Sequence, residues 1–218
     1  MNFSEYPGNL SARERWNAIH AENKREDIVY DAWLEDFDGL LESCATPVID
    51  LGCGGGNNVK YLVERGISLI ACDYSSAAIS NIRKNFPEVQ AAECFDMTEG
   101  LPFPDSFTDI IIADLSLHYF PERVTESLLR ELKRVLAPGG ILLARLNSVK
   151  DINHGAQEGE ELERHLRRSE DGRLKRFFDL EDIERFFADW DIVSAREGEL
   201  RRYALPKMLW TLMLRSKK

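Results

Sequence analysis

The sequence of 218 residues lacks long hydrophobic runs and has only four cysteines. No stretch approaches the roughly 18 apolar residues of a membrane-spanning helix, so we expect no membrane association. Residues 1–10 have neither a basic start nor an apolar core, unlike a secretory signal. The cysteines form no Cys-x-x-Cys pair, which disfavours a zinc knuckle or a thioredoxin-type site. These absences predict reduced, structural cysteines in a cytoplasmic protein.

Positive charge is also scarce. The chain has 28 Lys and Arg against 38 Asp and Glu, which gives a formal net charge of -10. Nucleic acids and anionic membranes bind clustered positive charge, so we expect neither as the partner. A chain of this length can bury a core of its own, and it contains no internal repeat. We therefore predict a single domain over residues 1–218, as a monomer or a homodimer.

From residue 48 onward, short apolar strands alternate with helices. We expect strands at residues 48–51, 68–72, 89–95, 108–113 and 141–146, and helices at 57–64, 75–85, 122–136 and 180–187, the last capped by Asp179. This alternation is typical of a parallel sheet with helices on both faces. Residues 190–196 and 208–214 are close in sequence and should pair antiparallel at the sheet edge. The sequence predicts an α/β, three-layer, doubly wound fold with a seven-stranded, mostly parallel sheet and an antiparallel last strand.

Two segments flank this alternation. Residues 11–44 have an apolar stripe that predicts helix, so residues 1–45 are expected to form an N-terminal helical cap. Residues 147–178 interrupt the pattern over a length that is too great for a simple loop. We interpret them as a lid-like insertion or a mobile segment.

Acidic residues follow three of the expected strands. Asp73, Asp96 and Asp114 end the second, third and fourth strands, and a glycine-rich loop ends the first. In open parallel sheets, ligands bind at the carboxyl ends of the strands. These residues are therefore placed where a binding site is expected.

The glycine-rich loop, residues 52–56, fits neither common nucleotide fingerprint. Dinucleotide binding requires Gly-x-Gly-x-x-Gly, but the third glycine position is Asn57 in one register and Val59 in the other. The phosphate-binding loop also fails, because no Lys-Ser/Thr follows. A backbone without side chains still lets a bulky ligand lie against it. Asp73 could accept both ribose hydroxyls and Asp96 an adenine amine, which fits an adenosyl ligand of positive charge.

Residues 48–56, Val-Ile-Asp-Leu-Gly-Cys-Gly-Gly-Gly, resemble motif I of the class I S-adenosylmethionine-dependent methyltransferases. The resemblance runs from about residue 48 to residue 146 and includes the Pro-Gly-Gly at 138–140. It implies the class I methyltransferase fold and S-adenosylmethionine as cofactor, with S-adenosylhomocysteine as product. In this resemblance Asp50 and the loop hold the methionine end, Asp73 the ribose, and residues 114–116 lie near the sulfonium. The implied cofactor-binding residues are Asp50, Gly52, Cys53, Gly54, Gly56, Asp73, Tyr74, Asp96, Met97, Asp114, Leu115 and Ser116.

His118 and Tyr119 follow the fourth strand, where the transferred methyl group should emerge. Histidine suits general-base work near neutral pH, so these two are the candidate catalytic residues. A histidine after a strand is as often a packing residue. His154 and His165 show no ligand spacing with His118, and we predict no metal. His20, Arg201, Arg202 and Tyr203 are weaker candidates for lining the site.

The expected acceptor is a small molecule. Residues 114–117 read Asp-Leu-Ser-Leu, unlike the Asp/Asn-Pro-Pro-Tyr/Phe of amino-methylating DNA enzymes. The resemblance therefore implies a methyltransferase that moves a methyl group to a small molecule by in-line displacement. Two alternatives stay open: a non-catalytic S-adenosylmethionine-binding sensor or partner subunit, and a nicotinamide-dependent oxidoreductase.

Overall fold

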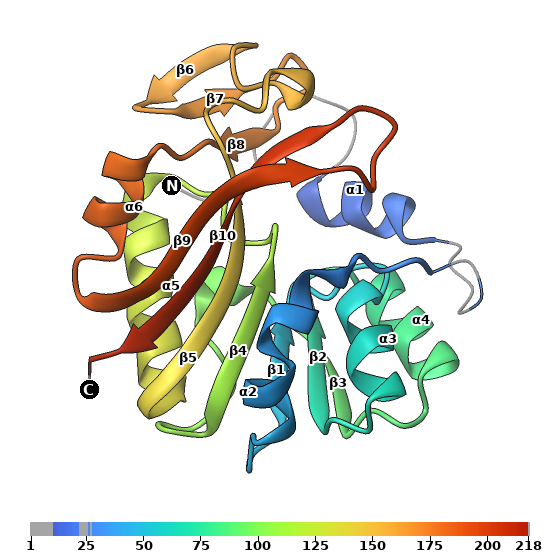
Figure 1. The fold of residues 1–218 in the computed structure, drawn as a ribbon. Helices are drawn as coiled ribbons and strands as arrows, with labels where there is room; N and C mark the ends of the chain where they lie inside the picture. Colours follow the sequence, from blue (N-terminus) through green and yellow to red (C-terminus); the bar gives the residue numbers. More distant parts are fainter. Residues whose placement is uncertain (1–10, 22–25, 27, 218) are drawn as a thin grey trace.

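The alternating strands form a seven-stranded sheet in the order β3-β2-β1-β4-β5-β10-β9 (Figure 1). The computed structural model describes residues 11–21, 26 and 28–217. The strands are β1 (Val48–Leu51), β2 (Leu69–Asp73), β3 (Ala91–Cys94), β4 (Thr108–Asp114), β5 (Leu136–Asn147), β9 (Trp190–Leu200) and β10 (Lys207–Ser216). The first five pair in parallel, and β10 is antiparallel to both β5 and β9. The predicted fold class is confirmed; β10 lies inside the sheet, so β9 forms its edge.

Helices cover both faces of this sheet. Helices α2 (Asp38–Glu42), α3 (Asn57–Glu64) and α4 (Ser76–Asn85) pack in one core, and α5 (Glu122–Val135) and α6 (Leu180–Phe186) pack in the other. The apolar strands are buried because both of their faces are covered. Ser75 caps α4 by accepting a hydrogen bond from the N–H of Ala78, and Asp179 caps α6, as predicted.

The N-terminal segment is less helical than the sequence predicts. After α1 (Ala12–Ile19), residues 28–31 form no helix, and Ala32–Phe37 is a 3₁₀ helix, so the prediction of helix over 11–44 is wrong there. Ile28 is not helical because its side chain is buried in the core and its carbonyl accepts a hydrogen bond from Lys60 Nζ at 2.8 Å, outside any helix. Residues 1–10, 22–25 and 27 lie outside the described residues, and so does the prediction made for them.

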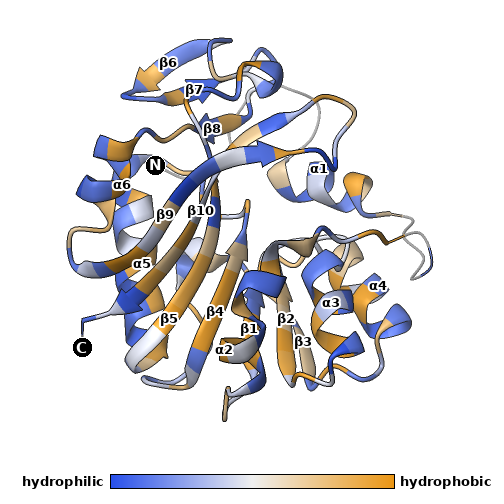
Figure 2. Cartoon of the chain, in the orientation of Figure 1, coloured by the Kyte–Doolittle hydropathy of each residue, from blue (hydrophilic) through white to orange (hydrophobic). Residues whose placement is uncertain are grey.

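Residues 147–178, called the insert below, contain a small sheet that the sequence did not predict. Strands β6 (Glu160–Glu163), β7 (Leu166–Arg168) and β8 (Leu174–Arg176) pair antiparallel. Figure 1 shows this sheet and α1 beyond the end of the main sheet to which β4 points. Figure 2 shows that the β6–β8 sheet is more hydrophilic than β4 and β5. Within the described ranges, no helix has the length and apolar character needed to cross a bilayer.

Candidate functional site

The glycine-rich loop turns sharply at the carboxyl end of β1. Gly52, Gly54 and Gly56 all have positive φ, a conformation that side chains disfavour. At Gly52 a Cβ atom would lie 2.4 Å from the Cβ of Ser116, so no larger residue fits. Cys53 is buried, and burial raises the pKa of its thiol well above the usual range. Cys53 therefore packs as a small apolar residue. The glycines beside it leave the backbone of the loop uncovered by side chains.

Asp50 lies fully buried beneath this loop. Its Oδ1 accepts a hydrogen bond from Asn58 Nδ2 at 3.1 Å, whereas its buried Oδ2 has no partner. Burial raises the pKa of Asp50 to about 7; the Asn58 hydrogen bond opposes this rise, and the negative charges of Asp114 and Asp73 add to it. An orphaned carboxylate oxygen among acidic neighbours fits a cationic group, such as the ammonium of S-adenosylmethionine.

Asp73, at the end of β2, lies against the glycine-rich loop. Its Oδ2 accepts from the N–H of Gly54 at 2.8 Å, and its Oδ1 accepts from the N–H of Ser75 at 2.7 Å. Next to it, the ring of Tyr74 lies under the guanidinium of Arg13, whose Cζ is 4.4 Å from the ring centroid. Asp73 is therefore oriented by two backbone groups and remains partly exposed.

Asp96 and Met97 follow β3. Asp96 begins the short 3₁₀ helix Met97–Glu99, and its Oδ1 accepts from both the backbone N–H and the hydroxyl of Thr98. Met97 is half-buried against the core. Both residues lie at the carboxyl ends of the strands, as Asp73 does, because β3 pairs in parallel with β2 and Asp73 is paired with Cys94.

Residues 114–116 follow β4 and differ in environment from one another. Asp114 forms a bidentate ion pair with Arg145, at 2.7 and 2.6 Å. Leu115 has a φ of 56°, and its N–H donates to the carbonyl of Arg145 at 3.0 Å. Ser116 Oγ donates to the carbonyl of Leu51 at 2.6 Å. This segment is therefore tied to both β1 and β5, the two strands beside β4.

A buried charge network connects this segment with the N-terminal region. Arg145 on β5 bonds both Asp114 and Asp31, the latter at 2.9 Å to each carboxylate oxygen. Burial alone would lower the pKa of Arg145, but the two carboxylates more than reverse this and raise it. Arg145 is a site residue that was not predicted, although an arginine within the apolar strand Ile141–Leu146 was an available signal.

His118 is placed deep in the protein. It is 2% exposed, and its Nδ1 has no hydrogen-bond partner. Burial, with the nearby charges of Lys207 and Lys175, lowers the pKa of His118 well below the usual range. Tyr119 lies beside it, with ring centroids 4.2 Å apart, and burial raises the pKa of its phenol. At neutral pH both side chains are uncharged.

Helix α1 lies across the glycine-rich loop and the start of α4. Asn17 Oδ1 accepts from Ser75 Oγ at 2.8 Å and from the N–H of Ala77 at 3.3 Å. The imidazole of His20 lies over the loop, with Cε1 at 3.3 Å from the position of a Cβ on Gly54. Trp16 contacts Tyr119 edge to face, at 5.4 Å between centroids. The weaker candidate His20 is thus next to the loop, whereas Arg201 is exposed and paired with Glu199.

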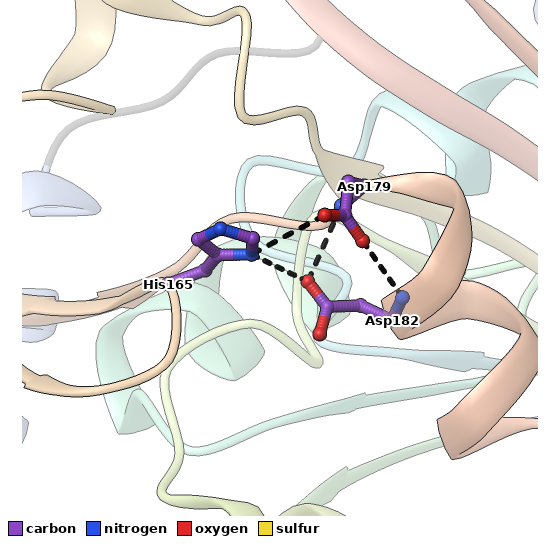
Figure 3. Close-up of side chains that lie close together, drawn as sticks. All are labelled: His165, Asp179 and Asp182. Carbon is purple, nitrogen blue, oxygen red and sulfur yellow. Dashed lines mark hydrogen bonds and ion pairs between the residues drawn. The ribbon is translucent and has the colours of Figure 1, made fainter.

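His165, Asp179 and Asp182 lie within ligand distance of one another (Figure 3). His165 Nδ1 is 2.6 Å from Asp182 Oδ2, and the two aspartates also form the capping box of α6. Arg164 pairs with both carboxylates. These contacts already satisfy the acidic oxygens, so the cluster gives no support to a metal site. The prediction of no metal stays a prediction.

A protein-family model described as a methyltransferase domain matches residues 49–144. The tRNA N(3)-cytidine methyltransferase METTL2 of Danio rerio is 30% identical over 161 residues, covering 66% of this chain and 44% of the relative. The trans-aconitate 2-methyltransferase of Delftia acidovorans is 35% identical over 105 residues, covering 47% and 38%. An S-adenosylmethionine-dependent methyltransferase structure from Methanosarcina mazei has a TM-score of 0.68 at 19% identity, covering 85% of this chain and 98% of that one.

Residues 49–144 are thus similar to methyltransferase domains, and the fold is that of a solved S-adenosylmethionine-dependent methyltransferase, in agreement with the resemblance. The chain spans less than half the length of the curated relatives that it matches. The matches give no support to the nicotinamide alternative.

Proposed function

We propose that the chain transfers a methyl group from S-adenosylmethionine to a small-molecule acceptor. The observation that supports this best is the buried carboxylate of Asp50, whose Oδ2 has no partner beneath the glycine-rich loop. Asp73 accepts from the N–H of Gly54 in that loop, and its negative charge adds to that of Asp50, whereas Asp114 is paired with Arg145. A cationic adenosyl ligand would offset the charge of Asp50 and Asp73.

Each half of the cofactor has a proposed set of contacts. The ammonium group would lie at Asp50 and the ribose at Asp73, while Tyr74, Asp96 and Met97 would line the adenine. Bound there, S-adenosylmethionine supplies an electrophilic methyl group on a sulfonium. The backbone of Gly52, Cys53, Gly54 and Gly56, and the segment Asp114, Leu115 and Ser116, would shape the methionine side of the site.

We propose that the protein acts mainly by alignment, which can contribute about 7–11 kcal/mol to a displacement reaction. His118 is the proposed proton acceptor where the nucleophile carries a proton, and it is available as the neutral imidazole. Its lowered pKa makes it a weak base, which suits an acceptor whose nucleophilic group gives up its proton readily. Tyr119 keeps its proton, so it does not act as the base, and its hydroxyl can hydrogen-bond the acceptor.

Residues 1–45 and the insert are proposed as cap and lid over this site. They contact each other at Arg15, whose Nη1 donates to the carbonyl of Asp171 at 3.0 Å. The two segments come from different parts of the sequence and reach the site separately. Helix α1 lies over Gly54, and in β8 the N–H of Arg176 donates to the carbonyl of His118 at 2.6 Å. Closure of both would exclude water from the reaction.

The choice of a small molecule rests on the charges of the insert and of α6. The arginines from 164 to 185 are paired with acidic residues, as in Arg167 with Glu161 and Arg168 with Glu160. The others are Arg164, Arg173, Arg176 and Arg185. A tRNA substrate, like that named for METTL2, would need a cationic surface. The relative named for trans-aconitate methylates a small molecule, and this chain's neutralised surface favours that class.

Thermal unfolding with S-adenosylhomocysteine, S-adenosylmethionine or NAD tests the cofactor. At about 100 times the dissociation constant, binding to the folded state adds about 2.7 kcal/mol, or roughly 5–10 °C in a chain of this size. We expect this shift with the two adenosyl ligands and none with NAD. Asp73→Ala should abolish it, whereas Asp189→Ala, an exposed change on the far loop, should leave it intact.

The same protein then tests catalysis. Incubation with tritium-labelled S-adenosylmethionine and a filtrate of small cellular metabolites should yield a labelled product. Binding of S-adenosylhomocysteine without any transfer would favour the alternative, a non-catalytic sensor or partner subunit. Labelling of macromolecules alone would overturn the small-molecule proposal.

A further inference from the structure

Cationic side chains gather around the segment that follows β4. Lys207 and Lys175 lie close enough to His118 for their charges to add to the lowering of its pKa by burial, and the charge of Arg173 opposes the rise that burial causes in the pKa of Tyr119. Arg202 reaches the other end of the segment, with Nη1 at 3.9 Å from Asp114. Three separate parts of the chain contribute these cations: the insert, the β9–β10 loop and the start of β10.

Several of these charges are neutralised in place. Lys207 Nζ is 2.6 Å from Asp151 Oδ2, and both side chains are buried. Arg173 Nε is 2.7 Å from Asp171 Oδ2. Each of these cations has a carboxylate of its own, so neither needs a ligand to balance its charge.

Lys175 differs from them. It is half-buried, its Nζ donates to the carbonyl of His154 at 3.2 Å, and no carboxylate of the described residues lies within ion-pair distance. Arg202, in contrast, is 3.4 Å from Asp31 and 3.9 Å from Asp114, so these two carboxylates balance the charges of Arg202 and Arg145 together. A partly buried cation without its own counter-ion, such as Lys175, is destabilising, and a bound anion would relieve that cost.

Lys175 lies beside His118 in the fold. The next residue, Arg176, donates its N–H to the carbonyl of His118 at 2.6 Å, and the charge of Lys175 acts on the His118 ring. The buried Nδ1 of that ring has no partner. On the other side, the ring of His154, whose carbonyl binds Lys175, contacts Tyr203 at 5.6 Å. An anion beside Lys175 would therefore find one cation and one unsatisfied ring nitrogen.

We propose that Lys175 binds an anionic group of the methyl acceptor, so that the acceptor is a small organic anion. This inference rests on the proposed function, because it names the substrate class of the same site. A carboxylate and a phosphate share the required chemistry: each offers several oxygens to an ammonium donor. The anion is an anchor that positions the acceptor beside His118 and Tyr119.

The first experiment sorts acceptors by charge. A filtrate of small metabolites is separated on an anion exchanger, and the retained and unretained fractions are each incubated with the protein and tritium-labelled S-adenosylmethionine. The inference predicts label only in products of the retained fraction. Treatment of that fraction with alkaline phosphatase before the assay separates the two sources: lost acceptor activity identifies a phosphate, and kept activity a carboxylate.

Matched variants test the residues with the acceptor fraction that is active. Lys175→Met keeps the length of the side chain but removes the charge, and should raise the KM for the acceptor about tenfold or more with kcat little changed. Lys175→Arg should restore the KM to within roughly threefold of the original protein. Lys150→Met is the control, because Lys150 is exposed and pairs with Glu197 on the surface. Binding of S-adenosylhomocysteine should be equal in all four proteins.

The outcomes distinguish failure of the anionic acceptor from failure of the proposed methyltransferase function. Label in the unretained fraction alone would leave the methyltransferase proposal standing and overturn the anionic acceptor. Equal KM values for Lys175→Met and Lys150→Met would also overturn it. If S-adenosylhomocysteine does not bind, or no fraction is labelled, the proposed function fails and this inference fails with it.

Discussion

The cofactor half and the acceptor half of the proposed site are held in place by different interactions. The cofactor half consists of a loop and strand ends fixed by backbone geometry, such as the positive φ of Gly52 and the hydrogen bond from the N–H of Gly54 to Asp73. The acceptor half consists of the insert and the β9–β10 loop. Backbone hydrogen bonds such as that from Arg176 to His118 attach the insert, and ion pairs such as that of Lys207 with Asp151 add to them. The cofactor half should therefore tolerate little added volume, whereas the acceptor half should depend on charge.

The two halves meet at Arg145, and its loss should have the largest effect. Arg145→Met would leave Asp31 and Asp114 with only the longer ion-pair contacts to Arg202, and the side chain of Arg145 is only 2% exposed. Breaking a buried pair in this way costs about 3–5 kcal/mol of unfolding free energy. Urea unfolding at neutral pH measures this loss.

The exposed pair of Arg196 and Asp36 is a natural control for Arg145. It also connects the N-terminal segment to the main sheet, but its side chains are 59% and 61% exposed. Arg196→Met should therefore cost less than about 1 kcal/mol, and less still at high salt. Equal losses in the two variants would mean that burial does not set the strength of these ion pairs.

Gly52→Ala tests the intolerance of the cofactor half. The added methyl group would lie 2.4 Å from the Cβ of Ser116 in a backbone conformation with a φ of 83°. We expect a loss of about 2–3 kcal/mol in stability and no detectable binding of S-adenosylhomocysteine. Gly39→Ala is the matched control, because nothing lies within 4 Å of a Cβ there and alanine favours α2. A Gly52→Ala protein that binds normally would contradict the proposed role of the loop.

The pKa of Asp50 predicts a smaller, pH-dependent effect on cofactor binding. Burial raises this pKa to about 7, so Asp50 is protonated in the free protein below that pH. Because the folded state holds this proton more tightly than the unfolded state, stability should fall as the pH rises from about 4 to about 7. The cofactor's ammonium favours the carboxylate form, so binding should strengthen as the pH rises through 7.

Isothermal titration measures this dependence directly. The affinity for S-adenosylhomocysteine should be about tenfold lower at pH 6 than at pH 8, as linkage to one group near 7 requires. Methylthioadenosine has no ammonium group, so its affinity should not change over that range. Asp50→Asn should remove the dependence for S-adenosylhomocysteine as well. A dependence shared by both ligands would place its origin outside Asp50.

The difference between the halves also explains what the sequence could predict. The order of the strands, the loop at residues 52–56 and the positions of Asp73 and Asp114 follow from a local pattern, since each strand ends where its apolar run ends. The Arg145 network joins residues 31, 114 and 145, which only the folded sheet brings together. Lys175 lies in the β6–β8 sheet, whose short and mostly polar strands have no clear periodicity.

For His118, the sequence predicted the position but not the chemical environment. Its place after the fourth strand predicted that it would lie near the reaction, but its lowered pKa depends first on burial in the folded protein and then on Lys207 and Lys175, which are far away in sequence. The N-terminal segment shows the limit for secondary structure. Its apolar stripe was compatible with a helix, yet the hydrogen bond from Lys60 to Ile28 favours an extended chain there. Tertiary contacts decided both cases.

Helix α1 has no buried residue, so its polar contacts should control whether it stays over the cofactor half. Asn17→Ala removes the acceptor for Ser75 Oγ and for the N–H of Ala77 at the start of α4. A capping oxygen contributes about 1 kcal/mol, which corresponds to roughly fivefold faster hydrogen exchange in residues 12–19 if they open locally. Hydrogen exchange followed by mass spectrometry measures this, and Asn17→Asp should restore protection, since it keeps the oxygen next to a helix N-terminus.

The same experiment with bound S-adenosylhomocysteine decides whether α1 belongs to the cofactor half. If α1 closes over the ligand, exchange in residues 12–19 should slow on binding in both the original protein and Asn17→Asp. In Asn17→Ala the slowing should be larger, because the ligand then orders a helix that starts from a more open state. Protection that does not change on binding would mean that α1 is anchored to α4 without covering the cofactor, and that His20 over Gly54 is only a packing contact.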